Sequence, residues 1–266
     1  MSYLTCRGRT GEIAWRNVKL WCTAVVALIG FLKLSPLGHA EEPATNHSTM
    51  SLDSFDTDQP GSFPAHWGVR GDEATAKAIY SIAEEDGNRF LRAYATKQDV
   101  QIGITRTFEP KQFPALQWRW RAKQLPTGAD ERNKQTNDSA AAVYVVFDNT
   151  TMPRAIKYVW SSSLPVGTRT KSPVYWRSYT VVLQSGDTHI GKWQQEVVNF
   201  YQDYKDIFGE EPGQVVGIAI LTDSDATKSV AEADYDDFVL LTVGAAKETR
   251  AKSTEMQPAP VMRNGQ

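Results

Sequence analysis

The chain has 266 residues, of which 41% are hydrophobic and 23% are charged, and its formal net charge is −2 at neutral pH. This hydrophobic content is enough for a sizeable core, and a charged fraction close to the globular average excludes a chain that is disordered throughout. The acidic balance argues against the basic footprint that nucleic-acid-binding proteins show.

The first 40 residues have the pattern of a signal peptide. Four basic residues precede an apolar run over residues 20–32, and Gly38-His39-Ala40 then places small residues at the cleavage positions. The run is shorter than the about 20 residues that a spanning helix needs. We therefore expect residues 1–40 to be a cleaved Sec-type signal and the mature protein to be periplasmic or secreted. An uncleaved N-terminal anchor is the alternative.

Both cysteines, Cys6 and Cys22, lie within this leader. A mature chain would hold no disulfide, no cysteine nucleophile and no cysteine-based zinc site. Removing the leader's five basic and one acidic residues from the totals of 29 and 31 leaves 24 basic and 30 acidic residues, a net charge of −6. We expect no nucleic-acid partner. The lack of a phosphate loop or dinucleotide fingerprint predicts no nucleotide ligand.

Residues 51–244 predict a single all-β domain, preceded by a flexible segment over residues 41–50. Asp86-Gly87 is a strong hairpin signal between two alternating segments. Residues 72–85 also allow a helix, but we favour the hairpin with an irregular or helical turn just before it. The expected strands cover residues 79–83, 89–95, 101–108, 115–122, 139–147, 155–161, 177–184, 193–200, 214–222 and 233–242.

One short helix is expected over residues 203–208, because Asp203 is a good N-cap and Gly209 a good stop. The polar, proline-interrupted segment 245–266 predicts a disordered tail. About ten strands with regular turns and hardly any helix are typical of a sandwich or barrel, and we expect a jelly-roll-like antiparallel β-sandwich.

Several motifs of the domain resemble one bacterial family. They include Trp118-Arg119-Trp120, Asn137-Asp138-Ser139-Ala140, Lys157-Tyr158-Val159-Trp160-Ser161, Thr222-Asp223-Ser224-Asp225 and Asp234-Tyr235-Asp236-Asp237. Over about residues 52–241 the chain is similar to the domain of unknown function 3047 family. The resemblance implies an exported bacterial protein and no particular activity.

A second resemblance, at the level of the fold, is to jelly-roll carbohydrate-binding modules. Asp53-x-Phe55, Phe63-Pro64-x-x-Trp67 and the closing strand from Tyr235 to Leu240 carry it. Carboxylates near the first and last strands of such modules can hold a structural calcium ion. The resemblance therefore implies Asp53, Asp236 and Asp237 as ligands of a structural Ca²⁺, and no other cofactor is expected. From the residues themselves, a salt bridge or a strand-end cap is favoured over calcium.

An acidic loop near the end of the domain supplies the catalytic candidates. Asp223 and Asp225 alternate with small polar residues after an apolar strand. Such oxygen ligands can wrap a hard cation, or they can act as a general acid and base. The same residues are also typical of a simple turn. Asp138, directly before another strand, is the third candidate.

Basic and amide side chains supply the ligand-binding candidates. Arg119 and Arg121 project from one face of their strand, Lys157 lies on an apolar strand, and Asn137 precedes another. If these strands are neighbours, their sheet presents a cationic face that suits the carboxylates of a uronan or a peptidoglycan strand. A solvated sheet face is the alternative.

Three tryptophans have two different expected roles. Trp118 and Trp120 alternate opposite the arginines, so we expect them in the core. Trp176 lies between a loop and a strand, where we expect an exposed platform on which a sugar ring stacks.

No catalytic motif is recognisable: the chain has no serine elbow and no histidines at metal-ligand spacing. This favours an exported, non-catalytic domain that binds a polysaccharide or a cell-envelope glycan and meets the membrane only through its cleaved signal. One alternative is a polysaccharide lyase or glycoside hydrolase acting on an acidic polysaccharide. Another is a structural envelope protein that binds a second protein through a sheet edge.

Overall fold

The computed structural model describes residues 48–148 and 152–255, with side chains as far as residue 249. All of them belong to one unit of the chain, residues 44–266. The expected signal peptide lies outside the described residues. Within the described part there are thirteen strands and three helices, and none of these helices is both long and apolar enough to cross a bilayer.

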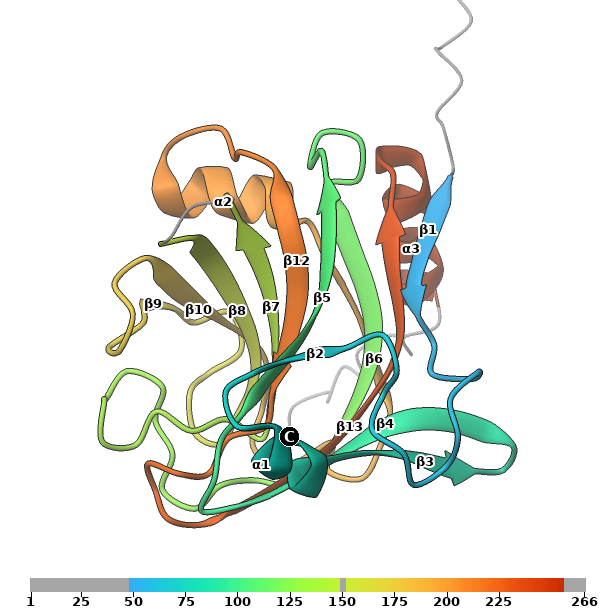
Figure 1. The fold of residues 1–266 in the computed structure, drawn as a ribbon. Helices are drawn as coiled ribbons and strands as arrows, with labels where there is room; N and C mark the ends of the chain where they lie inside the picture. Colours follow the sequence, from blue (N-terminus) through green and yellow to red (C-terminus); the bar gives the residue numbers. More distant parts are fainter. Residues whose placement is uncertain (1–47, 149–151, 256–266) are drawn as a thin grey trace, which may run out of the picture. The chain divides into compact units, whose positions relative to one another are not determined.

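The strands form two sheets, which we call sheet A and sheet B (Figure 1). Sheet A has the order β11-β6-β13-β4-β3, and β1 also pairs with β13. Its strands are β1 (Thr49–Asp53), β3 (Tyr80–Glu85), β4 (Asn88–Thr96), β6 (Ala115–Gln124), β11 (Gln194–Val198) and β13 (Val230–Leu241).

Sheet B has the order β2-β5-β12-β7-β8-β10-β9. Its strands are β2 (Gly68–Arg70), β5 (Gln101–Phe108), β7 (Ala141–Phe147), β8 (Arg154–Ser161), β9 (Arg169–Lys171), β10 (Ser178–Ser185) and β12 (Val215–Leu221). All neighbours in sheet B are antiparallel except β8 and β10, which run parallel.

Large aromatic side chains fill the space between the sheets. Trp118 and Trp120 of β6 are fully buried and pack edge to face, with ring centroids 5.3 Å apart. Trp118 also contacts Tyr158, and Trp120 contacts Trp160, so both pairs join sheet A to β8 of sheet B. Each such pair contributes about 0.5–1.5 kcal/mol beyond its burial. The expectation that Trp118 and Trp120 belong to the core is confirmed.

The expected all-β, jelly-roll-like sandwich is confirmed, and all ten expected strands are present with small shifts at their ends. The sequence missed β1, β2 and β9, which are only three to five residues long. β1 begins at Thr49, inside the segment expected to be flexible, because it pairs with the last residues of β13.

Helix α1 (Glu73–Ile79) precedes the hairpin of β3 and β4. Asp72 caps it by accepting the backbone N–H of Thr75 at 2.7 Å. Ala76 and Ile79 are buried on the inner side of the helix. The expected hairpin with a helical turn before it is confirmed, since β3 follows α1 directly.

Helix α2 (Phe200–Phe208) begins three residues before the expected helix over residues 203–208 and lies across one end of sheet B (Figure 1). The expected N-cap was wrong, because Asn199 caps the helix with its side chain. The carboxylate of Asp203 instead accepts the hydroxyl of Tyr158 at 2.8 Å. The expected stop at Gly209 is confirmed by its left-handed φ of 72°.

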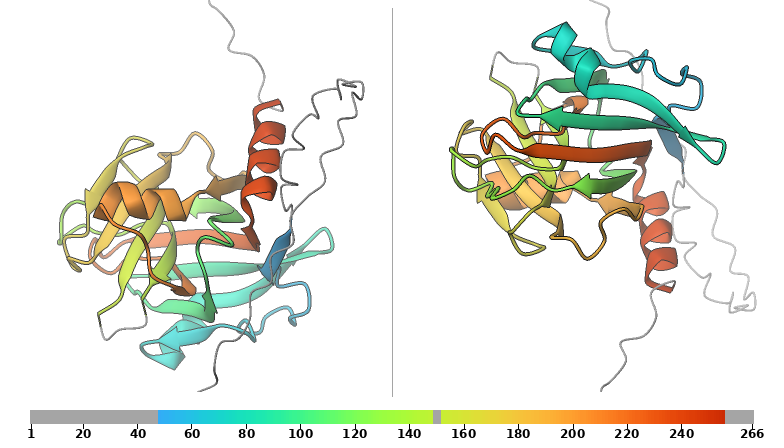
Figure 2. Two further views of the ribbon diagram at one scale, coloured as in Figure 1. Left: turned by 90° about the horizontal axis from the view of Figure 1, so that it is seen from above. Right: turned by 90° about the horizontal axis from the view of Figure 1, so that it is seen from below.

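Helix α3 (Val243–Glu255) occupies the first half of the segment that we expected to be a disordered tail, residues 245–266. Figure 2 shows it beside the sandwich rather than between the sheets. Ala245 packs with Ala115 and Leu241, which anchors the start of the helix. Residues 256–266 of the expected tail lie outside the described residues.

Close packing within sheet B predicts that Gly217 of β12 tolerates no side chain. A Cβ atom there would lie 2.7 Å from the backbone oxygen of Ile104 on β5. We expect Gly217→Ala to lower the free energy of unfolding by about 1–3 kcal/mol, as overpacking does, in urea denaturation. Gly68→Ala is the control, since its Cβ would lie 3.7 Å from the nearest atom. Equal stability of the two variants would contradict this account.

Candidate functional site

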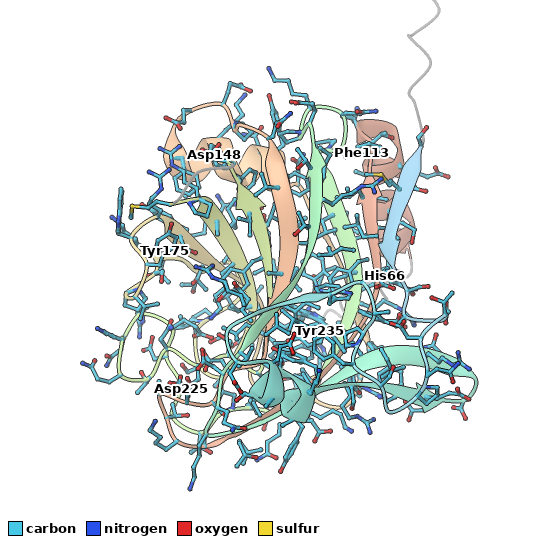
Figure 3. The ribbon with its side chains drawn as sticks, in the orientation of Figure 1. His66, Phe113, Asp148, Tyr175, Asp225 and Tyr235 are labelled. Atoms are coloured by element: carbon cyan, nitrogen blue, oxygen red, sulfur yellow. The ribbon has the colours of Figure 1, made fainter. Side chains whose placement is uncertain are left out.

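Sheet B carries an open cleft of about 810 Å³ on its outer face, away from the core. Neighbouring residues of β7 and β8 point into the core, so Tyr144 and Lys157 point outward into the cleft. The loop over residues 172–175 and residues 225–228 contribute to its walls. Figure 3 shows Tyr175 and Asp225 on the side of the sandwich where β8, β9 and β10 lie.

The cleft combines aromatic, amide, cationic and carboxyl side chains. They are Tyr144 and Tyr175; Gln98, Gln101 and Asn137; Arg70, Lys97, Lys157 and Lys228; and Asp72, Asp99 and Asp225. Of the residues expected from the sequence, Asn137, Lys157 and Asp225 therefore line one cleft. Asp138 and Asp223 are buried beside it.

Lys157 is a buried cation in the floor of the cleft, with 4% of its surface exposed. Its Nζ donates to Ser139 Oγ at 3.1 Å, and Ser139 in turn donates to Glu131 at 3.2 Å. Burial lowers the pKa of Lys157, but the neighbouring Tyr144, Asp223 and Glu131 raise it by more. The net shift is upward, so the amine is charged at neutral pH.

Asp138 fixes one wall of the cleft. It is fully buried and accepts the backbone N–H groups of Ala226 at 3.1 Å and Thr227 at 2.7 Å, together with the Thr227 hydroxyl. These bonds hold residues 225–228 against the strand that begins after Asp138. Its observed role is therefore to position the wall.

Asp223 is a carboxyl group that keeps its proton at neutral pH. Burial raises its pKa from 3.8 to about 8; Lys157 opposes this shift, and Asp138 adds to it. The side chain is 4% exposed. A carboxyl group that is protonated at neutral pH and lies beside a cleft can act as a general acid.

Three carboxyl groups gather at this end of the cleft. Oxygens of Asp99, Asp223 and Asp225 lie within 4.8 Å of one another. Burial, followed by the charges of Asp225 and Asp138, raises the pKa of Asp99. The spacing suits a divalent cation or an acid–base pair. The Lys157 ammonium works against a cation there, since it lies near Asp223 and carries the same sign of charge.

Arg119 and Arg121 lie elsewhere, on the outer face of sheet A. Because β6 and β8 belong to different sheets, the single cationic face predicted with Lys157 does not form. Both guanidinium groups stack on the ring of Trp193, at 5.2 and 4.8 Å from its centroid.

The same arginines are neutralised by β13. Arg119 lies 2.6 Å from Asp236 and 2.7 Å from Asp237, and Arg121 lies 2.6 Å from Asp234. Burial raises the pKa of Asp236 to about 6, a shift that its hydrogen bond from Asn88 and the nearby Arg119 oppose. Ion pairs, rather than a ligand, satisfy this face.

The expected calcium ligands are not brought together. Oxygens of Asp53, Asp236 and Asp237 do not all lie within 4.8 Å of one another, although all three are described residues. Asp53 accepts the backbone N–H of Phe55 at 2.8 Å and the indole N–H of Trp67 at 2.9 Å. The salt-bridge and capping alternatives describe these three residues.

Trp176 is exposed, as expected, with 58% of its surface accessible. The guanidinium of Arg177 lies over its ring at 5.3 Å. Its neighbour Tyr175 lines the cleft, whereas Trp176 does not. Tyr175 is held there because its hydroxyl donates to the Pro153 carbonyl at 2.7 Å.

Sequence reasoning missed Arg70, Lys97, Lys228 and the two tyrosines of the cleft. Tyr144 was detectable, since it is a polar-tipped residue that alternates with the core positions of β7. The cations lie in or beside loops and carry no local signal.

The fold and the cleft together define a β-sandwich with a polar cleft on the outer face of one sheet. The chain belongs to the family described as "Protein of unknown function (DUF3047)", whose pattern matches residues 66–239. The predicted family resemblance is thereby confirmed. No curated protein matches the chain.

Several solved structures are similar to this chain. The carbohydrate recognition domain of Emp47p has a TM-score of 0.41 at 10% identity, covering 73% of this chain and 95% of that one. The mannan-recognising module TmCBM27 has a TM-score of 0.35 at 12% identity, covering 73% of this chain and 98% of that one. The family 11 xylanase of Neocallimastix patriciarum has a TM-score of 0.30 at 9% identity, covering 74% of this chain and 97% of that one. Likeness at this level carries no argument about function.

Proposed function

We propose that the protein is an exported glycan-binding protein whose ligand lies in the cleft on sheet B. The observation that carries this proposal is the chemistry of the cleft lining. Two tyrosines stand among three amide side chains on one open concave surface of about 810 Å³. Sugar rings offer apolar faces for aromatic contact and hydroxyl groups for hydrogen bonds, and this lining supplies partners for both.

The tyrosines supply the aromatic contact. Tyr144 is half-buried in the floor and Tyr175 is half-buried in the wall. Since the Tyr175 ring is held by a backbone hydrogen bond, little of its side-chain entropy is lost when a ligand binds. Export is supported by the leader pattern of residues 1–40.

Removal of these rings tests the site. We expect Tyr144→Ala and Tyr175→Ala each to weaken glycan binding about tenfold, because each removes one aromatic contact worth about 1 kcal/mol or more. A glycan array that includes acidic polysaccharides and peptidoglycan fragments, followed by titration of the best ligand, measures this. Tyr94→Ala is the control, since Tyr94 is 49% exposed on β4 of the other sheet. Unchanged binding in both cleft variants would place the ligand elsewhere.

A second candidate is a carbohydrate-active enzyme, which the protonated Asp223 favours. A carboxylic acid with a pKa of about 8 can protonate a leaving oxygen at neutral pH. The same array distinguishes the two candidates when product release is followed alongside retention. Retention without product supports the binding protein. Product that Asp223→Asn no longer releases supports the enzyme. Silence on the whole panel would favour the protein-binding alternative.

A further inference from the structure

The cationic side chains of the cleft have no carboxylate partners. Arg70, Lys97, Lys157 and Lys228 all line it, and no described carboxylate lies within 4.0 Å of any of their nitrogens. Arg70 donates to a neutral partner, Gln101, at 3.4 Å. Within residues 48–148 and 152–249, the four positive charges therefore have no counter-ion at salt-bridge distance.

The outer face of sheet A shows the opposite arrangement. Arg92, Arg119 and Arg121 each lie within 3.2 Å of an aspartate on β13. Lys123 likewise lies 2.8 Å from Glu232. The same chain therefore pairs the cations of one outer face and leaves those of the cleft unpaired.

Lys157 is the most buried cation of the cleft, with 4% of its surface exposed. Tyr144, Asp223 and Glu131 favour its charged form, so its pKa stays raised and it remains an ammonium group in the floor of the cleft. An ammonium group has three donors. Ser139 accepts one at 3.1 Å and Tyr144 favours the charged form as a second partner, so at least one donor is left for a ligand.

Three carboxyl groups, Asp72, Asp99 and Asp225, line the cleft together with its four cations, so the cations outnumber them by one. Asp72 is engaged at the start of α1, where it accepts both the N–H and the hydroxyl of Thr75 at 2.7 Å. Asp223, with its pKa of about 8, is mainly protonated beside Lys157 at neutral pH. Burial, followed by the charges of Asp225 and Asp138, also raises the pKa of Asp99.

The cleft also adjoins a second groove on sheet B. This groove has a volume of about 300 Å³, and Arg70, Gln101 and Val146 line both. Gly103 and Gly217 keep the floor of that groove low. A polymer can therefore lie across several strands of sheet B.

We propose that the cleft selects an acidic glycan chain, and that Lys157 pairs with a carboxylate or sulfate group of it. This inference rests on the proposed function, since it names the chemical class of the glycan. Arg70, Lys97 and Lys228 add longer-range attraction at the rim, where their effect depends on salt.

Titration calorimetry with the full chain tests the selection. The probes are hexamers of galacturonate, the same hexamers after reduction of their carboxyl groups, and a sulfated neutral glucan. We expect at least one anionic probe to bind ten times or more tightly than the reduced hexamer. Preference for the sulfated glucan over the uronate would identify sulfate as the anion.

Lys157→Met should reduce the affinity for the anionic probe to that for the reduced hexamer, whose own binding should not change. Lys123→Met, on β6 of the other sheet, should bind all probes like the parent protein. Because Lys157 is buried, Lys97→Met at the exposed rim is the second variant, and it should weaken anionic binding about threefold at low salt.

The outcomes separate the two proposals. Equal binding of the charged and reduced hexamers would overturn the acidic selection and leave the glycan-binding function standing. Anionic binding that neither lysine variant weakens would also overturn it. If no probe binds, the acidic selection is overturned, and the glycan array decides separately whether the glycan-binding function stands.

Discussion

Asp234→Asn is expected to lower the free energy of unfolding by about 3–5 kcal/mol, the loss typical of breaking a buried ion pair. Asp234 is fully buried on β13 and accepts Nε and Nη2 of Arg121 at 2.9 and 2.6 Å, and Nε of Arg92 at 3.2 Å. The side chain of Arg121 is only 11% exposed. In Asp234→Asn, the Arg121 guanidinium loses the carboxylate that accepts two of its hydrogen bonds. Urea denaturation measures the resulting loss of stability.

Asp237→Asn is the matched control. It removes a carboxylate from the same strand, 2.7 Å from Arg119, but the side chain of Asp237 is 40% exposed. Exposed pairs contribute about 1 kcal/mol or less, so this variant should remain close to the parent protein. A loss for Asp234→Asn as small as that of the control would show that solvent reaches Arg121 more freely than its burial indicates.

This contrast also bears on which face binds ligand. The arginines of sheet A are held between β13 carboxylates and the ring of Trp193. A ligand there would have to displace short ion pairs. On sheet B, Lys157 offers a donor without breaking a salt bridge, so the energetic balance favours the cleft.

The sequence predicted the faces of individual strands well. In β6, strict alternation placed Trp118 and Trp120 in the core and Arg119 and Arg121 outside, because successive side chains of a strand point to opposite faces. Ten strands were found for the same reason. β2 and β9 have only three residues, which is too short to show a period, whereas β1 begins in a polar segment and was missed although it is as long as β11.

Strand neighbours were not predictable in this way. Alternation says that Arg119 and Lys157 each leave the core, but it does not say which sheet each strand joins. Pairing is decided by packing over the whole sandwich, and it placed β6 and β8 in opposite sheets. The predicted cationic face was therefore wrong, because it required β6 and β8 to be neighbours. Of its basic residues Arg119, Arg121 and Lys157, Lys157 alone lines the cleft.

Long-range backbone contacts assembled the rest of the cleft. Lys97 donates its N–H to the carbonyl of Ser229, and Asp138 accepts from Thr227, 89 residues away. No local pattern encodes such contacts. Helix α3 was missed for a related reason. Its polar sequence shows no helical period of apolar residues, and its start is anchored by the packing of Ala245.

Asp223→Asn is expected to stabilise the protein at alkaline pH. The folded state holds the Asp223 proton up to about pH 8, whereas the unfolded chain releases it near pH 3.8. Between these values the folded state binds more protons, so its stability falls as the pH rises and the loss is complete above about pH 8. The shift corresponds to at most about 6 kcal/mol, at about 1.4 kcal/mol per pKa unit.

The amide of the variant has no charge to lose, so its advantage should grow from near zero at pH 4 to about 2 kcal/mol or more at pH 9. Urea denaturation across this range, with EDTA present, measures it. A constant difference at all pH values would show that Asp223 ionises normally.

Glu196→Gln separates this stability effect from function. Burial raises the pKa of Glu196 on β11 to about 7, and hydrogen bonds from Gln184 and Trp120 oppose this shift. The stability of Glu196→Gln relative to the parent protein should therefore also increase as the pH rises. Glu196 does not line the cleft, and its variant should bind glycan normally. Asp223→Asn should bind an acidic glycan at least as tightly as the parent protein at neutral pH, and more tightly at pH 9, because it removes a group that becomes an anion beside Lys157. Weaker binding in Asp223→Asn would contradict this account.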